Sequence, residues 1–140
     1  MHINRCFLAD LALDNAITNG HTTTCDLLWS GLPIVTYPHT ENMPSRVASS
    51  ICLALGVPEM VSASFEDYEE RAVHLATNRH TALRDLRAKV CANRLTMPLF
   101  DTAQWVKHLE MGLEEAWRLF SNSGGKKDHI DLSHLNQLGY

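Results

Sequence analysis

The 140 residues, with 45% hydrophobic and 20% charged side chains, fit one soluble globular domain and are too few for two domains of ordinary size. The formal net charge of −4 argues against a general nucleic-acid binder, which needs a basic face. No apolar run reaches the roughly 18 residues of a membrane span, and no signal-peptide pattern opens the chain. We therefore expect a cytoplasmic or nuclear protein without nucleic-acid or membrane partners.

The cysteines and histidines are scattered along the chain. Cys6, Cys25, Cys52 and Cys91 form no C-x-x-C pair and lie in apolar stretches, so we interpret them as free, mostly buried thiols. The eight His residues show no zinc spacing. An Asp-x-Asp pair, which many glycosyltransferases use to hold a divalent ion against a sugar nucleotide, is also missing. We therefore expect neither a metal nor a cofactor.

The first predicted elements form a βαβ unit. Apolar runs of strand length occupy residues 7–14 and 33–38. Between them, a tight loop that turns into a helix is predicted at Asn19-Gly20-His21-Thr22-Thr23-Thr24-Cys25-Asp26. We expect Gly20 to supply a permissive backbone, the threonines to supply an N-cap hydroxyl, and Asp26 to place a negative charge in or near the first turn.

This loop is the expected ligand site. In a βαβ unit, ligands bind at the carboxyl ends of the strands, and the free N–H groups of a helix N-terminus suit a phosphate. His21 and the hydroxyls of Thr22 and Thr23 add side-chain donors at the same place. Because a Thr-rich helix start is often only a cap, these residues alone leave both a structural cap and a phosphate site open.

Further helices and one strand are predicted downstream of the βαβ unit. Gly31 is expected at the C-cap of the first helix. Ser45 is expected to cap a second helix, which Gly56 and Pro58 end, and residues 59–63 to form a third strand. The inner face of the second helix is predicted to hold Val47, Ser50, Ile51, Ala54 and Leu55.

Two more helices follow. The spacing of Ser64 and Asp67 indicates a capping box that opens a helix. One face of this helix is expected to hold Tyr68, Ala72, Leu75 and Ala76. The next helix is predicted over 81–93, with an apolar stripe of Leu83, Leu86 and Val90. Its basic residues indicate a solvated face or, as an alternative, a surface for an acidic partner.

A long amphipathic helix is predicted to begin at Asp101, where Gln104 completes the spacing of a capping box. Its stripe holds two Trp and one Phe, which need a large apolar partner surface: Trp105, Leu109, Leu113, Ala116, Trp117 and Phe120. From residue 121 the chain turns polar. We expect an α/β body with C-terminal amphipathic helices over 1–120 and a polar, flexible tail over 121–140.

The run from Leu8 to Pro33, followed by Ser45-Arg46-Val47-Ala48-Ser49-Ser50, resembles the C-terminal catalytic lobe of the protein O-linked N-acetylglucosamine (O-GlcNAc) transferases. Those enzymes, of the two-lobed GT-B type in glycosyltransferase family 41, transfer GlcNAc from UDP-GlcNAc to Ser and Thr hydroxyls of intracellular proteins. The resemblance covers roughly residues 2 to 120. It implies the C-terminal portion of a Rossmann-like lobe, with short parallel strands flanked by helices.

The resemblance also implies roles for single residues. It assigns stacking on uracil to His2, the neighbourhood of the base to Arg5, and the ribose hydroxyls to Asp26. No catalytic residue is assigned to this chain. The implied UDP-binding residues are His2, Arg5, His21, Thr22, Thr23 and Asp26.

The same resemblance places other parts of the enzyme upstream of this chain. These include two lysines that contact the donor, the helical repeats that bind acceptor proteins, and an N-terminal lobe that packs on the last helices. Where the family usually has a Pro-Gly-Glu turn, this chain has Pro38-His39-Thr40-Glu41, which is one residue longer and leaves the shape of the 38–44 loop and its contacts with the donor sugar open. We expect a fragment of an inverting, metal-independent transferase that uses UDP-GlcNAc. The alternatives are a truncated, inactive nucleotide-binding or protein-interaction module and an unrelated α/β phosphate-binding module.

Overall fold

A computed structural model describes residues 2–39 and 42–123. The chain divides into two compact units, Met1–Asp101 and Thr102–Tyr140. The first unit contains α1 (His2–Cys6), β1 (Ala12–Leu13), α2 (Thr22–Trp29), β2 (Ile34–Val35), α3 (Val47–Ala54), α4 (Phe65–Thr77) and α5 (Arg84–Asn93). Short 3₁₀ turns lie at η1 (Met43–Ser45), η2 (Pro58–Met60) and η4 (Pro98–Phe100), and a π-helical turn, η3, spans Arg79–Leu83.

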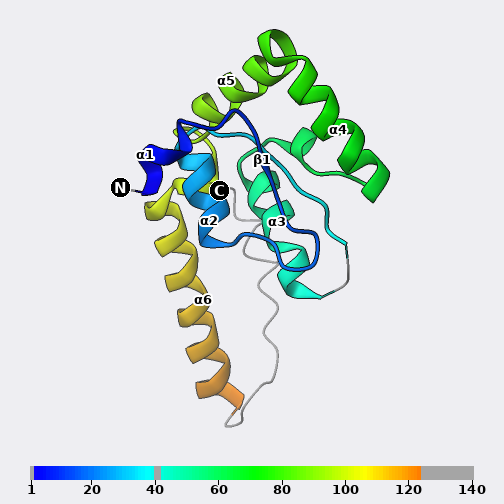
Figure 1. The fold of residues 1–140 in the computed structure, drawn as a ribbon. Coiled ribbons are helices and arrows are strands. Elements are labelled where there is room, and N and C mark those ends of the chain that lie inside the picture. The colour runs from blue at the N-terminus through cyan, green and yellow to red at the C-terminus, as the bar shows by residue number, and fades with distance from the viewer. Residues whose placement is uncertain (1, 40–41, 124–140) are drawn as a thin grey trace. The chain divides into compact units, whose positions relative to one another are not determined.

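A parallel βαβ unit lies at the centre of the first unit, as predicted. Strands β1 and β2 pair in parallel, with Ala12 opposite Ile34, and α2 connects them and contacts β2 (Figure 1). One further parallel bridge joins Thr36 to Val61. The predicted α/β class is therefore confirmed, and β1 leads directly into the loop that carries the candidate site.

The first strand is much shorter than the predicted 7–14. Only Ala12–Leu13 is a strand, because the chain leaves α1 in a turn in which the amide of Leu8 donates to the carbonyl of Arg5 at 3.0 Å. The side chain of Leu8 is 89% exposed. The apolar composition of this run therefore reflects exposed surface rather than a buried strand.

The third strand predicted at 59–63 is wrong. Pro58 begins the 3₁₀ turn η2 instead, since the fixed φ of proline suits the first turn of a helix. The amide of Val61 donates back to the carbonyl of Pro58 at 3.0 Å. Extended pairing is therefore limited to the single bridge between Val61 and Thr36.

The core forms where α2, α3, α4 and α5 pack around β2 (Figure 1). Its buried side chains come from all of these elements and from the short turns between them. They are Leu28, Ile34, Val35, Cys52, Leu55, Val57, Met60, Leu75, Leu83, Leu86 and Val90. The apolar stripe predicted for 81–93 is confirmed, although α5 begins only after the π-helical turn η3.

Helix α3 forms in the predicted place, and its predicted inner face is confirmed in part. Leu55 is buried and Ile51 packs half-buried on the core, as expected, whereas Ser50 is exposed. Ala48, Ser49 and Cys52 are buried in addition. Ser45 lies in the preceding turn η1. The hydroxyl of Ser45 donates to the carbonyl of Asn42 at 2.9 Å, so the predicted cap of α3 is wrong.

The second unit contains α6 (Thr102–Ser123), the long amphipathic helix predicted from the sequence. The large apolar residues of its stripe are exposed, and the rings of Trp117 and Phe120 lie 6.0 Å apart between centroids. In the described part of the chain, no helix has the length and apolar character of a membrane span. Most of the predicted tail, from residue 124, lies outside the described residues.

The cysteines are free thiols, as expected, and Cys6 and Cys52 are buried. Burial raises the pKa of the Cys52 thiol to about 12, with a further contribution from the negative charge of Asp14. The folded chain therefore keeps this thiol protonated through neutral and mildly alkaline pH.

This raised pKa predicts a loss of stability in alkaline solution. An unfolded thiol ionises near its ordinary pKa of 9.0, so ionisation favours the unfolded chain between pH 9 and about 12. Urea unfolding should show a free energy that falls with pH above 9, more steeply than in a Cys52→Ala variant by up to about 1.4 kcal/mol per pH unit. Parallel pH profiles of the two proteins would contradict this.

Ser30 is the C-cap of α2, so Gly31 lies one residue beyond the predicted C-cap position, with a φ of +84°. A Cβ at this position would lie 2.5 Å from Sγ of Cys91. We expect Gly31→Ala to lower the free energy of unfolding by about 1–3 kcal/mol, because it adds both backbone strain and a clash. The measurement is urea denaturation.

Gly112 provides the matched control, because it lies inside α6. Gly112→Ala should keep or raise the stability, since alanine is the better helix former. If both substitutions change the free energy of unfolding equally, the backbone conformation of Gly31 does not explain the loss of stability.

Candidate functional site

The start of α2 is open and uncapped. His21 occupies the N-cap position with φ −96° and ψ −87°, and its side chain makes no capping hydrogen bond. The first amide that bonds within the helix is that of Cys25, which donates to the carbonyl of His21 at 3.2 Å. Thr22 and Thr23 are exposed, and neither their amides nor their hydroxyls have an acceptor among the residues that the structure describes. His21, Thr22 and Thr23 therefore place several donors at one solvent-facing point.

The predicted N-cap by a threonine is wrong. The N-cap position belongs to His21, and the buried Thr24, the third residue of the helix, donates its hydroxyl back to the carbonyl of Gly20 at 2.6 Å. The φ of Gly20 is not positive, so the expected use of its backbone freedom is also wrong. Gly20 instead provides space, since a Cβ there would lie 2.8 Å from Oγ1 of Thr24.

Asp26 is the fifth residue of α2 and lies beyond its first turn. The sequence had predicted a position in or near that turn, where the carboxylate would interact with the helix dipole. Asp26 is half-buried, and its charge adds to burial in raising the pKa of Cys25. Thr22 and Asp26 are four residues apart, so they share one face of the helix. The carboxylate is therefore one turn away from the exposed threonines.

Helix α1 brings the other predicted residues towards α2. The two helices are in contact, and Arg5 lies exposed in the last turn of α1. No hydrogen bond or ion pair joins Arg5 to the α2 residues in the described part of the chain. His2 is the first residue of α1, and its side chain lies outside the described part. The structure thus places the predicted set on two adjacent helices.

Asp14 holds the loop in place, a role that sequence reasoning missed. Its Oδ1 accepts the amide of Gly20 at 2.8 Å, and its Oδ2 accepts the hydroxyl of Thr36 at 2.7 Å. Its carbonyl accepts the hydroxyl of Tyr68 at 3.0 Å. One residue at the end of β1 therefore fixes the loop to β2 and α4. The signal in the sequence was an acid at the end of a strand, close before a glycine.

Asn19 fixes the other end of the same loop. It is only 4% exposed, and its Oδ1 accepts the amide of Ala48 at 3.1 Å. Its own amide donates to the carbonyl of Pro44 at 2.9 Å, and its Nδ2 donates to the carbonyl of Asn15 at 2.8 Å. The approach to α2 is thereby tied to η1 and α3. Among residues 2–39 and 42–123, no three His, Cys, Asp or Glu side chains gather as a metal site.

Known proteins are similar to this chain in sequence and in fold. The probable UDP-N-acetylglucosamine–peptide N-acetylglucosaminyltransferase SEC of Arabidopsis thaliana is 48% identical over 132 residues, which cover 94% of this chain and 13% of that protein. The UDP-N-acetylglucosamine–peptide N-acetylglucosaminyltransferase of Caenorhabditis elegans is 43% identical over 129 residues, 92% of this chain and 11% of that protein.

Among solved structures, a mutant O-GlcNAc transferase of Thermobaculum terrenum superposes with a TM-score of 0.79 at 26% identity, over 89% of this chain and 24% of that one. This match confirms the predicted fold class, a portion of the catalytic region of such a transferase. The chain spans only 13% and 11% of the length of the two relatives named above. The sequence model of Glycosyl transferase family 41 matches residues 1–109, and the chain therefore belongs to that family.

Proposed function

We propose that this chain is a part of a UDP-GlcNAc:protein O-GlcNAc transferase and carries some of the residues that bind the UDP of the donor. Membership of the family supports the reaction class. The observation that carries the proposal is the uncapped start of α2, where His21, Thr22 and Thr23 present donors to solvent. In the complete enzyme the acceptors are Ser and Thr hydroxyls of other proteins.

The chemistry of the reaction explains why donors are needed at this point. As the bond between the sugar and UDP breaks, the diphosphate gains negative charge. Donors already aimed at that charge stabilise the transition state, and one such donor typically contributes on the order of 3 kcal/mol. In the proposed site these donors are the first amides of α2, the threonine hydroxyls and the His21 imidazole. They serve in place of a divalent cation.

The nucleoside is proposed to lie across α2 and α1. Asp26 is one helical turn from Thr22 on the same face, which suits a carboxylate that accepts the ribose hydroxyls. Helix α1 is in contact with α2 and carries Arg5 and His2, to which we assign the uracil. The order of groups along the surface then follows the order of groups in UDP.

The acceptor half of the reaction is assigned to other parts of the protein. Inversion requires the acceptor hydroxyl to attack from the face opposite the diphosphate, and we assign no base for this step to the described residues. The small share of the relatives that this chain covers supports that division. The same small share also favours the alternative of an inactive nucleotide-binding or protein-interaction module.

The first test is UDP binding by isothermal titration calorimetry, with the parent chain and a His21→Ala, Thr22→Ala double variant. Hydrogen bonds to charged groups are worth about 1.5–3 kcal/mol each, so the double variant should bind at least about tenfold more weakly.

The matched control is His80→Ala, Thr81→Ala, the same residue pair on the exposed π-helical turn η3. It should leave the affinity unchanged. Equal weakening by both double variants would contradict the proposed cradle. A folded parent chain that binds no uridine nucleotide would favour the interaction module.

A second prediction concerns Asp14, which orients the loop without being a proposed UDP contact. Asp14→Ala removes the acceptors for Gly20 and Thr36, so UDP affinity should fall at least about fivefold. Asp14→Asn keeps an oxygen for the Gly20 amide and should lose less. The control is Asp10→Ala, which breaks only the exposed ion pair with Arg79. Unchanged affinity in a folded Asp14→Ala variant would refute this positioning role.

A further inference from the structure

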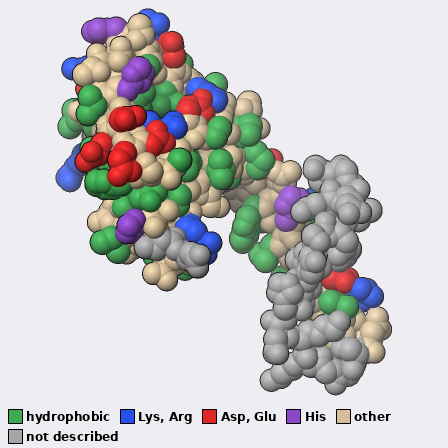
Figure 2. Space-filling model, turned by 90° about the vertical axis from the view of Figure 1, so that its right-hand side faces the viewer, with side chains coloured by type: hydrophobic (Ala, Val, Ile, Leu, Met, Phe, Trp, Pro, Cys, Tyr) green, Lys and Arg blue, Asp and Glu red, His purple; other side chains and the backbone are tan. Residues whose placement is uncertain are grey.

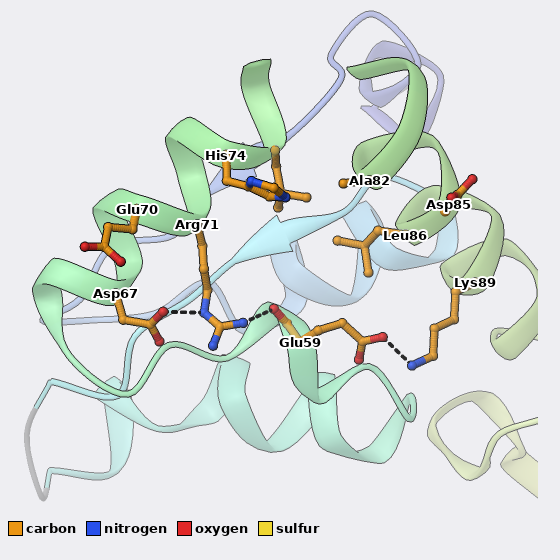
Figure 3. Close-up of a pocket in the computed structure, with 10 residues that line it drawn as sticks. Glu59, Asp67, Glu70, Arg71, His74, Ala82, Asp85, Leu86 and Lys89 are labelled. Atoms are coloured by element: carbon orange, nitrogen blue, oxygen red, sulfur yellow. Dashed lines mark hydrogen bonds and ion pairs between the residues drawn. The ribbon is translucent and has the colours of Figure 1, made fainter. Parts of the chain in front are cut away.

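A pocket of about 690 Å³ lies between α4 and α5, and none of the proposed UDP-binding residues lines it (Figures 2 and 3). Its volume falls within the range of about 300–1,000 Å³ that is usual for ligand sites. The lining combines an apolar floor with charged walls: Glu59, Asp67, Glu70, Arg71, His74, Leu75, Ala82, Asp85, Leu86 and Lys89. The α4/α5 pocket is therefore separate from the proposed nucleotide site.

The floor of the α4/α5 pocket is apolar. Leu75 of α4 and Leu86 of α5 are each 8% exposed and belong to the core, and Ala82 packs half-buried beside them (Figure 3). An aliphatic side chain placed on this floor would be shielded from water at little cost in rearrangement, because core residues already hold the floor rigid.

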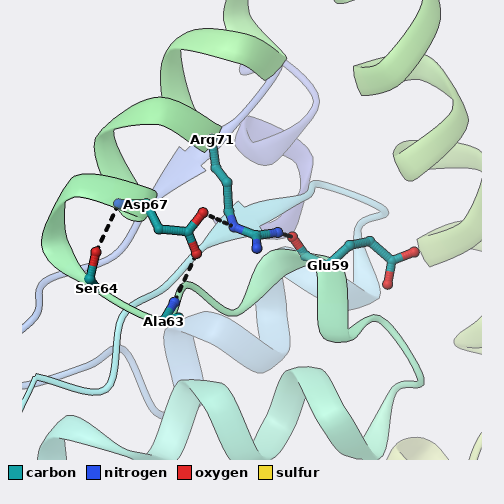
Figure 4. A network of polar contacts seen from close by, with 5 residues as sticks. All are labelled: Glu59, Ala63, Ser64, Asp67 and Arg71. Atoms are coloured by element: carbon teal, nitrogen blue, oxygen red, sulfur yellow. Dashed lines mark hydrogen bonds and ion pairs between the residues drawn. The ribbon is translucent and has the colours of Figure 1, made fainter.

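The first cation of the pocket is already neutralised. Nε of Arg71 pairs with Oδ1 of Asp67 at 2.8 Å, and its Nη1 donates to the carbonyl of Glu59 at 2.8 Å (Figure 4). The predicted capping box forms in part. The Asp67 amide donates to Oγ of Ser64 at 3.1 Å, but the Asp67 carboxylate accepts the amide of Ala63, at 2.8 Å, one residue before the cap. The Ala63 amide and Arg71 lower the pKa of Asp67, so its carboxylate stays ionised at neutral pH.

The second cation is neutralised as well. Lys89 pairs with the carboxylate of Glu59 (Figure 3). Burial raises the pKa of Glu59, but the Lys89 hydrogen bond and the nearby charges of Lys89 and Arg71 outweigh it, and the pKa is lowered overall. Asp85 pairs only with exposed Arg84, at 3.2 Å.

Negative charge therefore remains on the rim. The lining holds four carboxylates and two cations, and the carboxylate of Glu70 has no hydrogen bond or ion pair with any described residue. Figure 2 shows acidic side chains gathered on one face of the first unit. An occupant that complements this pocket needs positive charge at its ends and an apolar group between them.

We propose that the α4/α5 pocket binds an extended peptide segment of a partner protein, in which an apolar residue is flanked by lysines or arginines. The apolar residue lies on Leu75 and Leu86. The long basic side chains lay their aliphatic stems along the walls and bring their charges to the carboxylates of Glu70 and Asp85, the lining acids that Arg71 and Lys89 do not neutralise. Charge complementarity selects this occupant over an acidic or a neutral segment.

The test is an NMR titration of the ¹⁵N-labelled 140-residue chain with three blocked peptides. The first has the sequence Gly-Lys-Leu-Lys-Gly, the second replaces leucine by serine, and the third replaces both lysines by glutamates. Amides of residues 70–75 and 82–89 should shift with the first peptide, shift less with the second and not respond to the third. Equal responses to all three peptides, or shifts confined to other residues, would overturn the proposal.

A charge reversal on the protein completes the test. Glu70→Lys should weaken binding of the first peptide by about three- to tenfold, whereas Glu69→Lys, an exposed neighbour outside the pocket with the same change in net charge, should not. Circular dichroism confirms that both variants fold. Equal affinities of the two variants would overturn the proposal. Shifts at the same amides when the protein is concentrated without peptide would mean that a second copy of the chain occupies the pocket. This result would also overturn the proposal.

Discussion

The hydrogen bonds of Asp14 are the constraint on which the candidate site depends. Its carboxylate and carbonyl join the loop before α2 to Thr36 beside the sheet and to Tyr68 of α4. Bonds to an ionised acceptor are about twice as strong as neutral ones, and here they act on a half-buried group. The negative charge also raises the pKa of Tyr68, after burial, which keeps that hydroxyl protonated as a donor. Asp14 therefore fixes the loop at the start of α2 to Thr36 and Tyr68.

The two helix starts at α2 and α4 show what an available N-terminus requires. At α4, Ser64 satisfies the amide of Asp67, so the first turn is closed by its own chain. At α2, the hydroxyl of Thr24 is used inside, on the carbonyl of Gly20, and His21 does not cap. Both segments hold hydroxyl residues near a helix start, but Ser64 occupies the N-cap position of α4, whereas His21 occupies that of α2 and Thr24 lies inside the helix. The residue at the N-cap therefore decides whether the amides of the first turn are satisfied by the chain itself.

Local patterns predicted the elements well, and long-range contacts decided what the patterns missed. The βαβ order, the turn at Gly31 and the stripe from Leu83 to Val90 follow from spacing within a few residues. The lengths of the strands depend on their pairing partners, which periodicity does not contain. The roles of Asp14 and Asn19 were hidden for the same reason, because their partners lie far along the chain. The family resemblance named UDP contacts but not the residues that hold them in place.

The bond between Asp14 and Tyr68 spans 54 residues, and that between Asn19 and Ala48 spans 29. Closing such long loops costs entropy, so contacts of this kind form late relative to local turns and helices. The β1–α2 loop can therefore reach its final shape only after α3 and α4 have docked. During synthesis the segment from residue 14 to 26 leaves the ribosome well before the residues that order it, so the proposed phosphate site is completed among the last parts of the unit.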